Sequence, residues 1–199
     1  MNWKYTRRDD GIIAVTLDNN VWEFLYQRKI DLAAELPSNE FAIFITREVE
    51  IERMAIPDNE SKAALRSYID QTIAKCGIRT TSVFGFATDG PGPQRVGGFD
   101  QGTFQSQTER EFYDSIRERY LLGKTETNSQ LTQNEADAAV AAQSFFSIAL
   151  TCEKPGKSGP LRFASQHGGA VLYLADFDQS GLTLKERVTA FYRQNVNRP

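Results

Sequence analysis

Histidine and cysteine are scarce in this sequence, with one His and two Cys among 199 residues. A catalytic scheme that needs a histidine base has the single candidate His167, in a segment, SQHGGA, that predicts a solvated turn. Cys76 and Cys152 stand too far apart in the sequence to predict a metal-binding knuckle, so we expect both to be reduced and buried. Neither residue type offers a ready set of metal ligands.

The sequence also lacks long apolar runs and an excess of positive charge. No run approaches the roughly 18 residues of a membrane span. The basic N-terminal segment precedes only about six apolar residues, too few for the core of a signal peptide. We therefore expect a cytoplasmic protein that does not contact a membrane. With 26 acidic and 23 basic residues the net charge is −3, so any binding of nucleic-acid phosphates must be local.

Only one stretch is rich in glycine and proline, and the rest has the composition of a globular protein. Hydrophobic residues make up 40% and charged residues 25% of the chain, which is ordinary for a soluble domain with one core. The Gly/Pro-rich segment 88–102 is too long for a routine connection. We predict a single domain over 1–199, with an insertion or lid at about 77–130.

Short apolar runs alternate with amphipathic segments along the chain. Runs rich in β-branched or aromatic residues predict buried strands. They lie at 11–17, 41–46, 147–153 and 170–178, with an extra strand at 80–87. Apolar residues at helical spacing predict the helices, of which the first has Asn19 or Asn20 as its cap. They lie at 19–36, 47–56, 60–76, 106–123, 134–146 and 182–196. This alternation predicts an α/β fold, a three-layer α/β/α sandwich with a mostly parallel central sheet.

Acidic residues follow the predicted strands and begin the helices beside them. Asp18 comes directly after the first strand, and Glu153 ends a later one. Glu48 and Glu52 lie four residues apart on one helix, so they share a face. Asp137 lies near the start of the alanine-rich helix. In a parallel sheet these carboxylates converge on one rim, beyond the carboxyl ends of the strands.

Such a cluster needs a counter-charge, because like charges within about 4 to 6 Å raise one another's pKa values. A divalent cation removes this repulsion. Ligation by oxygen alone, with no usable set of His or Cys, favours Mg²⁺ or Mn²⁺ over zinc. A metal held in this way can acidify a water molecule and polarise a phosphodiester.

The order of these motifs resembles that of the PIN domain, a family of metal-dependent nucleases. The segment LDNNVW resembles the turn after the family's first strand and supplies Asp18. The segment FITREVEIE is similar to a strand and helix that end in glutamate, here Glu52. The segments NEADAAVAA and ALTCE resemble the motifs of the third and fourth acids, here Asp137 and Glu153.

The resemblance implies a function and a set of roles. Asp18, Asp137 and Glu153 would hold Mg²⁺ or Mn²⁺, and Glu52 would complete the cluster or orient the attacking water. Supporting roles fall to Asn20, Thr151 and Glu48, of which the last competes with Glu52 for its place. The family implies a nuclease that hydrolyses single-stranded or structured RNA, often the toxin of a toxin–antitoxin pair. An antitoxin protein is then an expected partner, and a homodimer is the default oligomer.

Local cations are candidates for holding the phosphates of RNA. Arg47 and Arg53 border the predicted site, and Lys154 and Lys157 follow Glu153. We predict that these four side chains contact nucleic acid.

Two other interpretations stay open. The segment VLYLADFDQSG also looks like the Toprim domains of topoisomerases and primases, in which Asp176 and Asp178 would bind magnesium beside Glu153. Alternatively, the chain is a PIN-like module that binds RNA or a protein without cutting. The absence of a strongly basic composition is compatible with that second interpretation.

Overall fold

A five-stranded parallel sheet organises the protein, as a computed structural model that describes residues 3–84, 93–97, 102 and 104–196 shows. The strand order is β3-β2-β1-β6-β7, and each neighbouring pair is parallel. Its strands are β1 (Ile13–Leu17), β2 (Phe41–Thr46), β3 (Arg79–Thr81), β6 (Ile148–Thr151) and β7 (Val171–Tyr173). A separate parallel pair comprises β4 (Val83–Phe84) and β5 (Val96–Gly97).

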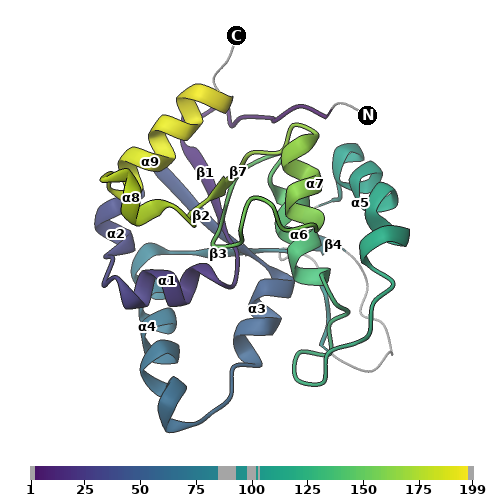
Figure 1. Cartoon of the computed structure of the whole chain (residues 1–199), viewed down its shortest axis with the longest axis horizontal. Helices are drawn as coiled ribbons and strands as arrows, with labels where there is room; N and C mark the ends of the chain where they lie inside the picture. Colours follow the sequence, from purple (N-terminus) through teal and green to yellow (C-terminus); the bar gives the residue numbers. More distant parts are fainter. Residues whose placement is uncertain (1–2, 85–92, 98–101, 103, 197–199) are drawn as a thin grey trace.

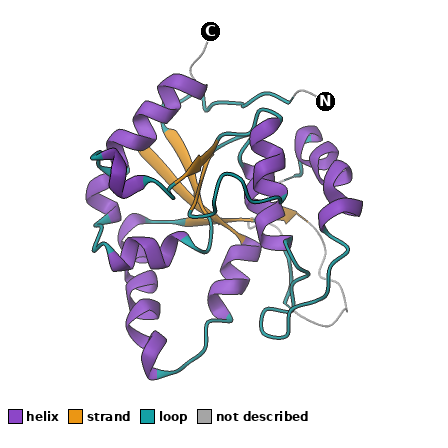
Figure 2. Cartoon of the chain, viewed as in Figure 1, coloured by secondary structure: helices purple, strands orange, loops and turns teal. Residues whose placement is uncertain are grey.

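The helices cover both faces of this sheet (Figures 1 and 2). They are α1 (Val21–Gln27), α2 (Leu32–Glu35), α3 (Arg47–Met54), α4 (Glu60–Cys76), α5 (Gln107–Tyr120), α6 (Glu135–Gln143), α7 (Pro160–Gln166), α8 (Phe177–Ser180) and α9 (Leu184–Phe191), followed by a π-helical turn (Tyr192–Val196). Helices α1, α2, α4 and α9 lie on one side, and α5, α6 and α7 on the other (Figure 1). The predicted three-layer α/β/α fold with a parallel central sheet is confirmed.

The central strands are buried because both of their faces are covered. In β1, Val15 and Leu17 have no exposed surface, and all four residues of β6 are buried. Helix α6 packs directly on β1, β2 and β6. Its small side chains allow this close approach, since Ala138 and Ala141 are fully buried. In the described residues, no helix has both the length and the apolar character that crossing a bilayer requires.

Several predicted elements have different bounds in the structure. The helix predicted at 19–36 is divided into α1 and α2, because the chain turns at Lys29, whose φ is +53°, and Asp31 caps the second helix. The strand predicted at 170–178 ends at Tyr173 and is followed by the short helix α8. Helix α7 was not predicted, although Pro160 at its first position is a common start signal.

The segment predicted as an insertion or lid, 77–130, contains elements of two kinds. Strand β3 belongs to the central sheet, whereas β4, β5 and α5 lie outside it. Helix α5 starts with a capping box between Ser106 and Glu109. Most of the Gly/Pro-rich segment 88–102 falls outside the described residues, so the lid stays a prediction.

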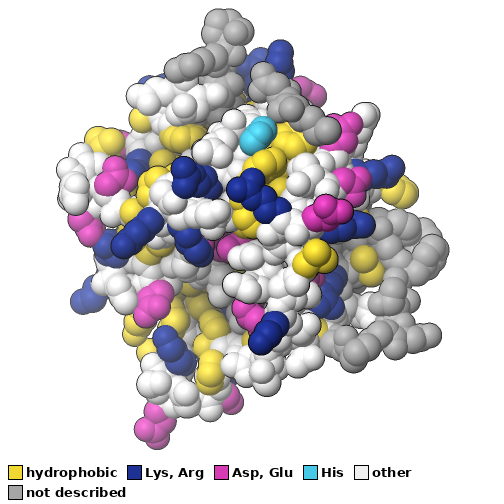
Figure 3. All heavy atoms as spheres, turned by 45° about the vertical axis from the view of Figure 1, so that its right-hand side comes forward, with side chains coloured by type: hydrophobic (Ala, Val, Ile, Leu, Met, Phe, Trp, Pro, Cys, Tyr) yellow, Lys and Arg dark blue, Asp and Glu magenta, His cyan; other side chains and the backbone are white. Residues whose placement is uncertain are grey.

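The turn predicted at His167 is confirmed, but its side chain packs against aromatic residues and is only partly solvated. His167 ends α7, is only partly exposed, and stacks on Phe163 with ring centroids 4.1 Å apart. The ring is visible at the surface beside hydrophobic side chains (Figure 3). Cys76 and Cys152 are free thiols, as expected, but are only partly buried.

Gly168 allows the N-terminal segment to pack against the end of α7. Its φ of +100° is unfavourable for other residues, and an added Cβ would lie 2.1 Å from the backbone oxygen of Trp3. We expect Gly168→Ala to lower the free energy of unfolding by more than about 1 kcal/mol in urea titrations. Gly156→Ala is the control, because nothing lies within 4 Å of its added Cβ. Equal stability of the two variants would contradict this packing.

Candidate functional site

The sheet has a topological switch point between β1 and β6. From β1 the chain continues to β2 and β3 on one side, whereas β6 and β7 lie on the other. In open α/β sheets, ligands bind beyond the carboxyl ends of the strands at such a point, because the connections leave in opposite directions and open a crevice. Asp18 directly follows β1, and Thr151 is the last residue of β6.

Asp18 is the most deeply buried carboxylate at this point. Its residue is 2% exposed. One carboxylate oxygen accepts the backbone N–H of Asn19 at 2.7 Å, and the other accepts from Asn20 Nδ2 at 2.6 Å and from Thr151 Oγ1 at 2.7 Å. Burial raises the pKa of Asp18, and the negative charge of Glu153 raises it further, whereas these hydrogen bonds lower it. The carboxylate is held in one orientation but lacks a cation of its own.

Asn20 links the ends of the two central strands. It occupies the N-cap position of α1, as expected, but its side chain makes no capping hydrogen bond. Its Nδ2 instead donates to Asp18, and its Oδ1 accepts the backbone N–H of Cys152 at 2.7 Å. Thr151 Oγ1 also accepts the backbone N–H of Glu153 at 3.1 Å. These contacts fix Asp18 relative to the segment that carries Glu153.

Glu52 and Asp137 reach the same region from α3 and α6, which pack against each other. Burial, and after it the charge of Asp18, raise the pKa of each carboxyl to about 7. The Glu52 pKa is also raised by Asp137, and the Asp137 pKa by Glu153. The acids on α3 and α6 are thus close enough to the acids that follow β1 and β6 for their charges to repel one another.

Glu153 and Lys157 form the ion pair nearest to these acids. The Glu153 side chain is 8% exposed and accepts from Lys157 Nζ. This contact is the main cause of the raised Lys157 pKa, and the charges of Asp137 and Asp18 add to it. Lys157 therefore neutralises part of the charge at the site. Lys154 is exposed to solvent, so it is available to an anionic ligand.

The structure thus brings together the four acids that the motifs indicated, here called the acid cluster: Asp18, Glu52, Asp137 and Glu153. It adds Glu126, whose charge raises the pKa values of Glu52 and Asp137. Sequence reasoning missed Glu126 because it lies in the polar connector 124–133. The isolated bridge between Thr125 and Thr132 folds that connector back toward the start of α6.

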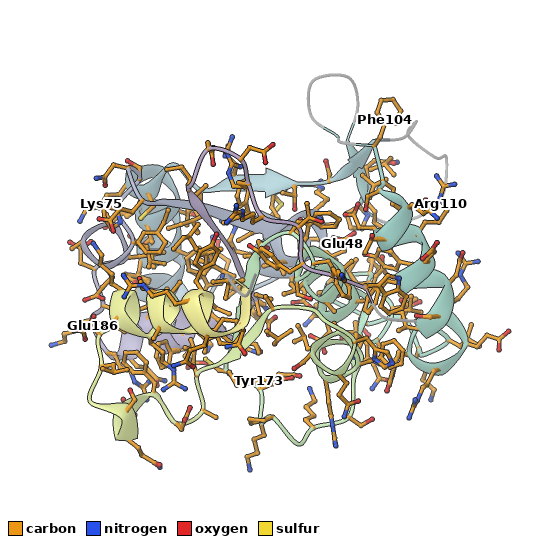
Figure 4. All side chains as sticks on the ribbon, turned by 90° about the horizontal axis from the view of Figure 1, so that it is seen from above. Glu48, Lys75, Phe104, Arg110, Tyr173 and Glu186 are labelled. Carbon is orange, nitrogen blue, oxygen red and sulfur yellow. The ribbon has the colours of Figure 1, made fainter. Side chains whose placement is uncertain are left out.

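Glu48 has different neighbours from Glu52. Its pKa is raised to about 7 by burial and by the charge of Glu135, and lowered by Arg95. Figure 4 shows Glu48 inside the molecule on the side of α5. One turn of α3 therefore separates two carboxyls with different surroundings, and Glu52, not Glu48, shares the charges of the acid cluster.

The two arginines on α3 are engaged with residues other than those of the acid cluster. Arg47 pairs with Glu50, and Arg53 pairs with Asp70 on α4 at 2.6 Å. Of the four cations predicted to hold RNA, Lys157 is the one whose charge acts on the acid cluster.

Asp176 and Asp178 are exposed and paired with arginines. Asp176 accepts from Arg187, and Asp178 accepts from Arg28. Each contact lowers the pKa of its aspartate. These two acids have the surroundings of ordinary surface ion pairs, unlike Glu153, with which the Toprim-like interpretation would group them.

The side chains of the acid cluster are not arranged as a complete metal-binding site in this structure. Among the described residues, no three His, Cys, Asp or Glu side chains make a group that could hold a metal ion. The donor chemistry nevertheless suits a hard cation, because all the candidate ligands are carboxylates and several have raised pKa values.

Comparisons with known proteins add no family assignment. No family model matches the sequence, and no curated protein is significantly similar to it.

The raised pKa values of Glu52 and Asp137 make the stability depend on pH. Unfolded, these carboxyls lose their protons near pH 4, roughly, whereas in the fold their pKa values are about 7. The folded state holds more protons between these limits, so the free energy of unfolding falls as the pH rises. We expect Asp137→Asn to lose less stability than the parent between about pH 5 and pH 8, measured by urea unfolding with EDTA.

Asp178→Asn serves as the control for this measurement. Its pKa is lowered by Arg28, so any stability it contributes is lost only at more acidic pH, and the slope between about pH 5 and pH 8 should stay that of the parent. An unchanged slope in Asp137→Asn as well would contradict the repulsion inferred for the acid cluster.

Proposed function

We propose that this protein is a Mg²⁺- or Mn²⁺-dependent nuclease of PIN type that hydrolyses RNA. One observation carries the proposal: acids from four separate segments meet at the switch point of a parallel sheet, where burial and the charges of neighbouring acids raise the pKa values of Asp18, Glu52 and Asp137. Structural ion networks also perturb pKa values, but they pair acids with bases. Here several carboxylates share one lysine among the described residues.

A divalent cation fits the donor set. Asp18, Asp137 and Glu153 would hold it, with Glu52 completing the group. When bound, the ion would acidify a water molecule and stabilise charge on the phosphodiester. Because the free carboxylates repel one another, ion binding would be coupled to their loss of protons and would tighten with rising pH.

The chain's own residues would orient the reacting groups. Asn20 and Thr151 hold the Asp18 carboxylate through the hydrogen bonds described above. Glu52, with a pKa of about 7, can accept a proton from water at neutral pH, because a general base works best when its pKa lies near the working pH. Lys157 is placed to pair with a substrate phosphate once Glu153 has another cation.

RNA is the proposed substrate, and its binding depends on local charge. A net charge of −3 gives no general attraction to phosphates. The bound cation, Lys157 and the exposed Lys154 would supply the positive charge at the acid cluster. An inhibiting antitoxin, a homodimer and a cytoplasmic location stay predictions that accompany the PIN resemblance.

Removal of single carboxylates tests the proposed activity. Asp18→Asn and Asp137→Asn should each lower the rate of cleavage of single-stranded RNA with Mn²⁺ by about a hundredfold or more, since each lost carboxylate weakens the hold on the cation. Rates are measured on 5′-labelled RNA by gel electrophoresis. Asp178→Asn, an exposed aspartate outside the acid cluster, should cleave like the parent.

Three other outcomes would identify a different function. Equal cleavage by all variants would reveal a contaminating nuclease and refute the proposal. RNA binding without cleavage by any of them would favour the non-catalytic module. Loss of cleavage in Asp176→Asn or Asp178→Asn alone would favour the Toprim-like interpretation.

Asn20→Ala tests the support of Asp18. Hydrogen-bond partners of metal ligands contribute about 10- to 100-fold to metal affinity, so we expect a Mn²⁺ dissociation constant raised by that order in isothermal titration calorimetry. Asn195→Ala, on an exposed turn, should leave the constant unchanged. If the Asn20 variant bound Mn²⁺ as tightly as the parent, Asn20 would have no supporting role.

A further inference from the structure

A cavity on the α5 side of the molecule takes no part in the proposed cleavage. Its volume is about 340 Å³, and its walls come from α3, α5, α6 and the β4–β5 pair. The residues that matter for its chemistry are Glu48, Arg95, Arg110, Tyr113, Arg117 and Glu135. We call it the α5 cavity.

The inner part of the α5 cavity contains an unpaired acid. Glu135 forms an ion pair with Arg95, and Arg95 Nη2 also donates to the backbone oxygen of Gln130 at 2.7 Å. These contacts hold the Arg95 side chain against the wall of the cavity. No Lys or Arg of the described residues forms an ion pair with Glu48. The pKa of the Tyr113 hydroxyl is raised mainly by burial and then by the charge of Glu48.

The outer part carries positive charge from one face of α5. Arg110 is exposed and forms no ion pair with any described residue. Arg117 is also exposed, and its one ion pair, with Asp114, is long at 3.8 Å. Figure 4 shows Arg110 at the outer edge of α5, with Glu48 further inside. The cavity therefore has an acceptor at its inner end and two exposed arginines at its mouth, of which Arg117 is paired only loosely with Asp114.

This arrangement defines the ligand chemistry. Once ionised, the Glu48 carboxylate only accepts hydrogen bonds, so a ligand that binds this form must offer N–H donors at the inner end. The mouth requires an anion such as a phosphate, which Arg binds well. Guanine offers two adjacent N–H donors on its Watson–Crick edge, whereas adenine and cytosine place a ring acceptor beside their amino group, which would repel a carboxylate. We propose that the α5 cavity binds a guanine nucleotide, with its base toward Glu48 and its phosphate toward Arg110 and Arg117.

The same two helices carry both sites. On α3, Glu48 belongs to the α5 cavity and Glu52 to the acid cluster, and on α6 the corresponding residues are Glu135 and Asp137. A guanine nucleotide in the cavity can be a free molecule or one residue of an RNA strand that reaches the acid cluster. The second source rests on the proposed function, whereas the first does not.

Calorimetric titrations of the full chain with nucleoside 5′-monophosphates in EDTA test the proposal without any cleavage. Guanosine monophosphate should bind about tenfold more tightly than the adenosine and cytidine forms, the discrimination expected of a bidentate contact. Inosine monophosphate, which lacks the guanine amino group, should bind more weakly than guanosine monophosphate. Equal binding of all four nucleotides, or no binding at all, would overturn the proposal.

Variants assign the contacts. Glu48→Gln should remove most of the preference for guanine. Arg110→Ala should weaken the binding of all the nucleotides to a similar extent. Glu118 is an exposed glutamate on α5, and Glu118→Gln should bind the nucleotides like the parent. Because Glu48 is partly buried, urea titrations of each variant must show an unfolding transition like that of the parent. A folded Glu48→Gln protein with unchanged preference would refute the role of Glu48.

RNA pentamers distinguish the two sources of the nucleotide. With Asp137→Asn, single-stranded pentamers containing one guanosine should bind about tenfold more tightly than guanosine-free pentamers if the strand is the source. Binding of guanosine monophosphate with no preference among pentamers would support a free nucleotide instead. A failure of the nuclease proposal would leave the monophosphate result unaffected, so the two proposals can fail separately.

Discussion

The burial of one carboxylate, Asp18, constrains the centre of the molecule. It lies where two parallel strands end and the connections diverge, and it stays there because Asn20, Thr151 and the backbone of Asn19 donate to it. A carboxylate removed from water is costly unless its lone pairs are satisfied. Those donors come from β6 as well as from the turn after β1, so satisfying Asp18 also joins the two halves of the sheet.

The fold was largely readable from the sequence, because its main signals are local. The apolar run FAIFIT forms a strand that is mostly buried, and α4 ends at Gly77, whose φ is +60°. The division of the helix predicted at 19–36 was not readable, because periodicity continues across the break. The positive φ of Lys29 and the cap from Asp31 reveal it, and residues of α4 and α9 contact the second helix and its cap through Lys75 and Lys185.

The acid cluster shows the same division between local and long-range information. The order of motifs indicated Asp18, Glu52, Asp137 and Glu153, and the structure places their charges within reach of one another. The order of motifs in the sequence did not reveal Glu126, because this residue belongs to no recognisable motif. The sequence also could not show which of Glu48 and Glu52 belongs to the acid cluster, because a spacing of four residues places both on one helical face. The difference arises from their surroundings: Glu52 lies near the charges of Asp18 and Asp137, whereas Glu48 lines the α5 cavity near Glu135.

Trp3 shows how late this fold can be completed during synthesis. Its ring packs against Phe112, Phe145 and Phe163, with centroids 5.5 to 6.4 Å apart. Those partners leave the ribosome more than a hundred residues after Trp3. Strand β1 likewise waits for β6, to which it is paired. Trp3 and strand β1 thus stay without part of their native cover through most of translation, a period in which exposed apolar residues are prone to aggregate and are typical clients of chaperones.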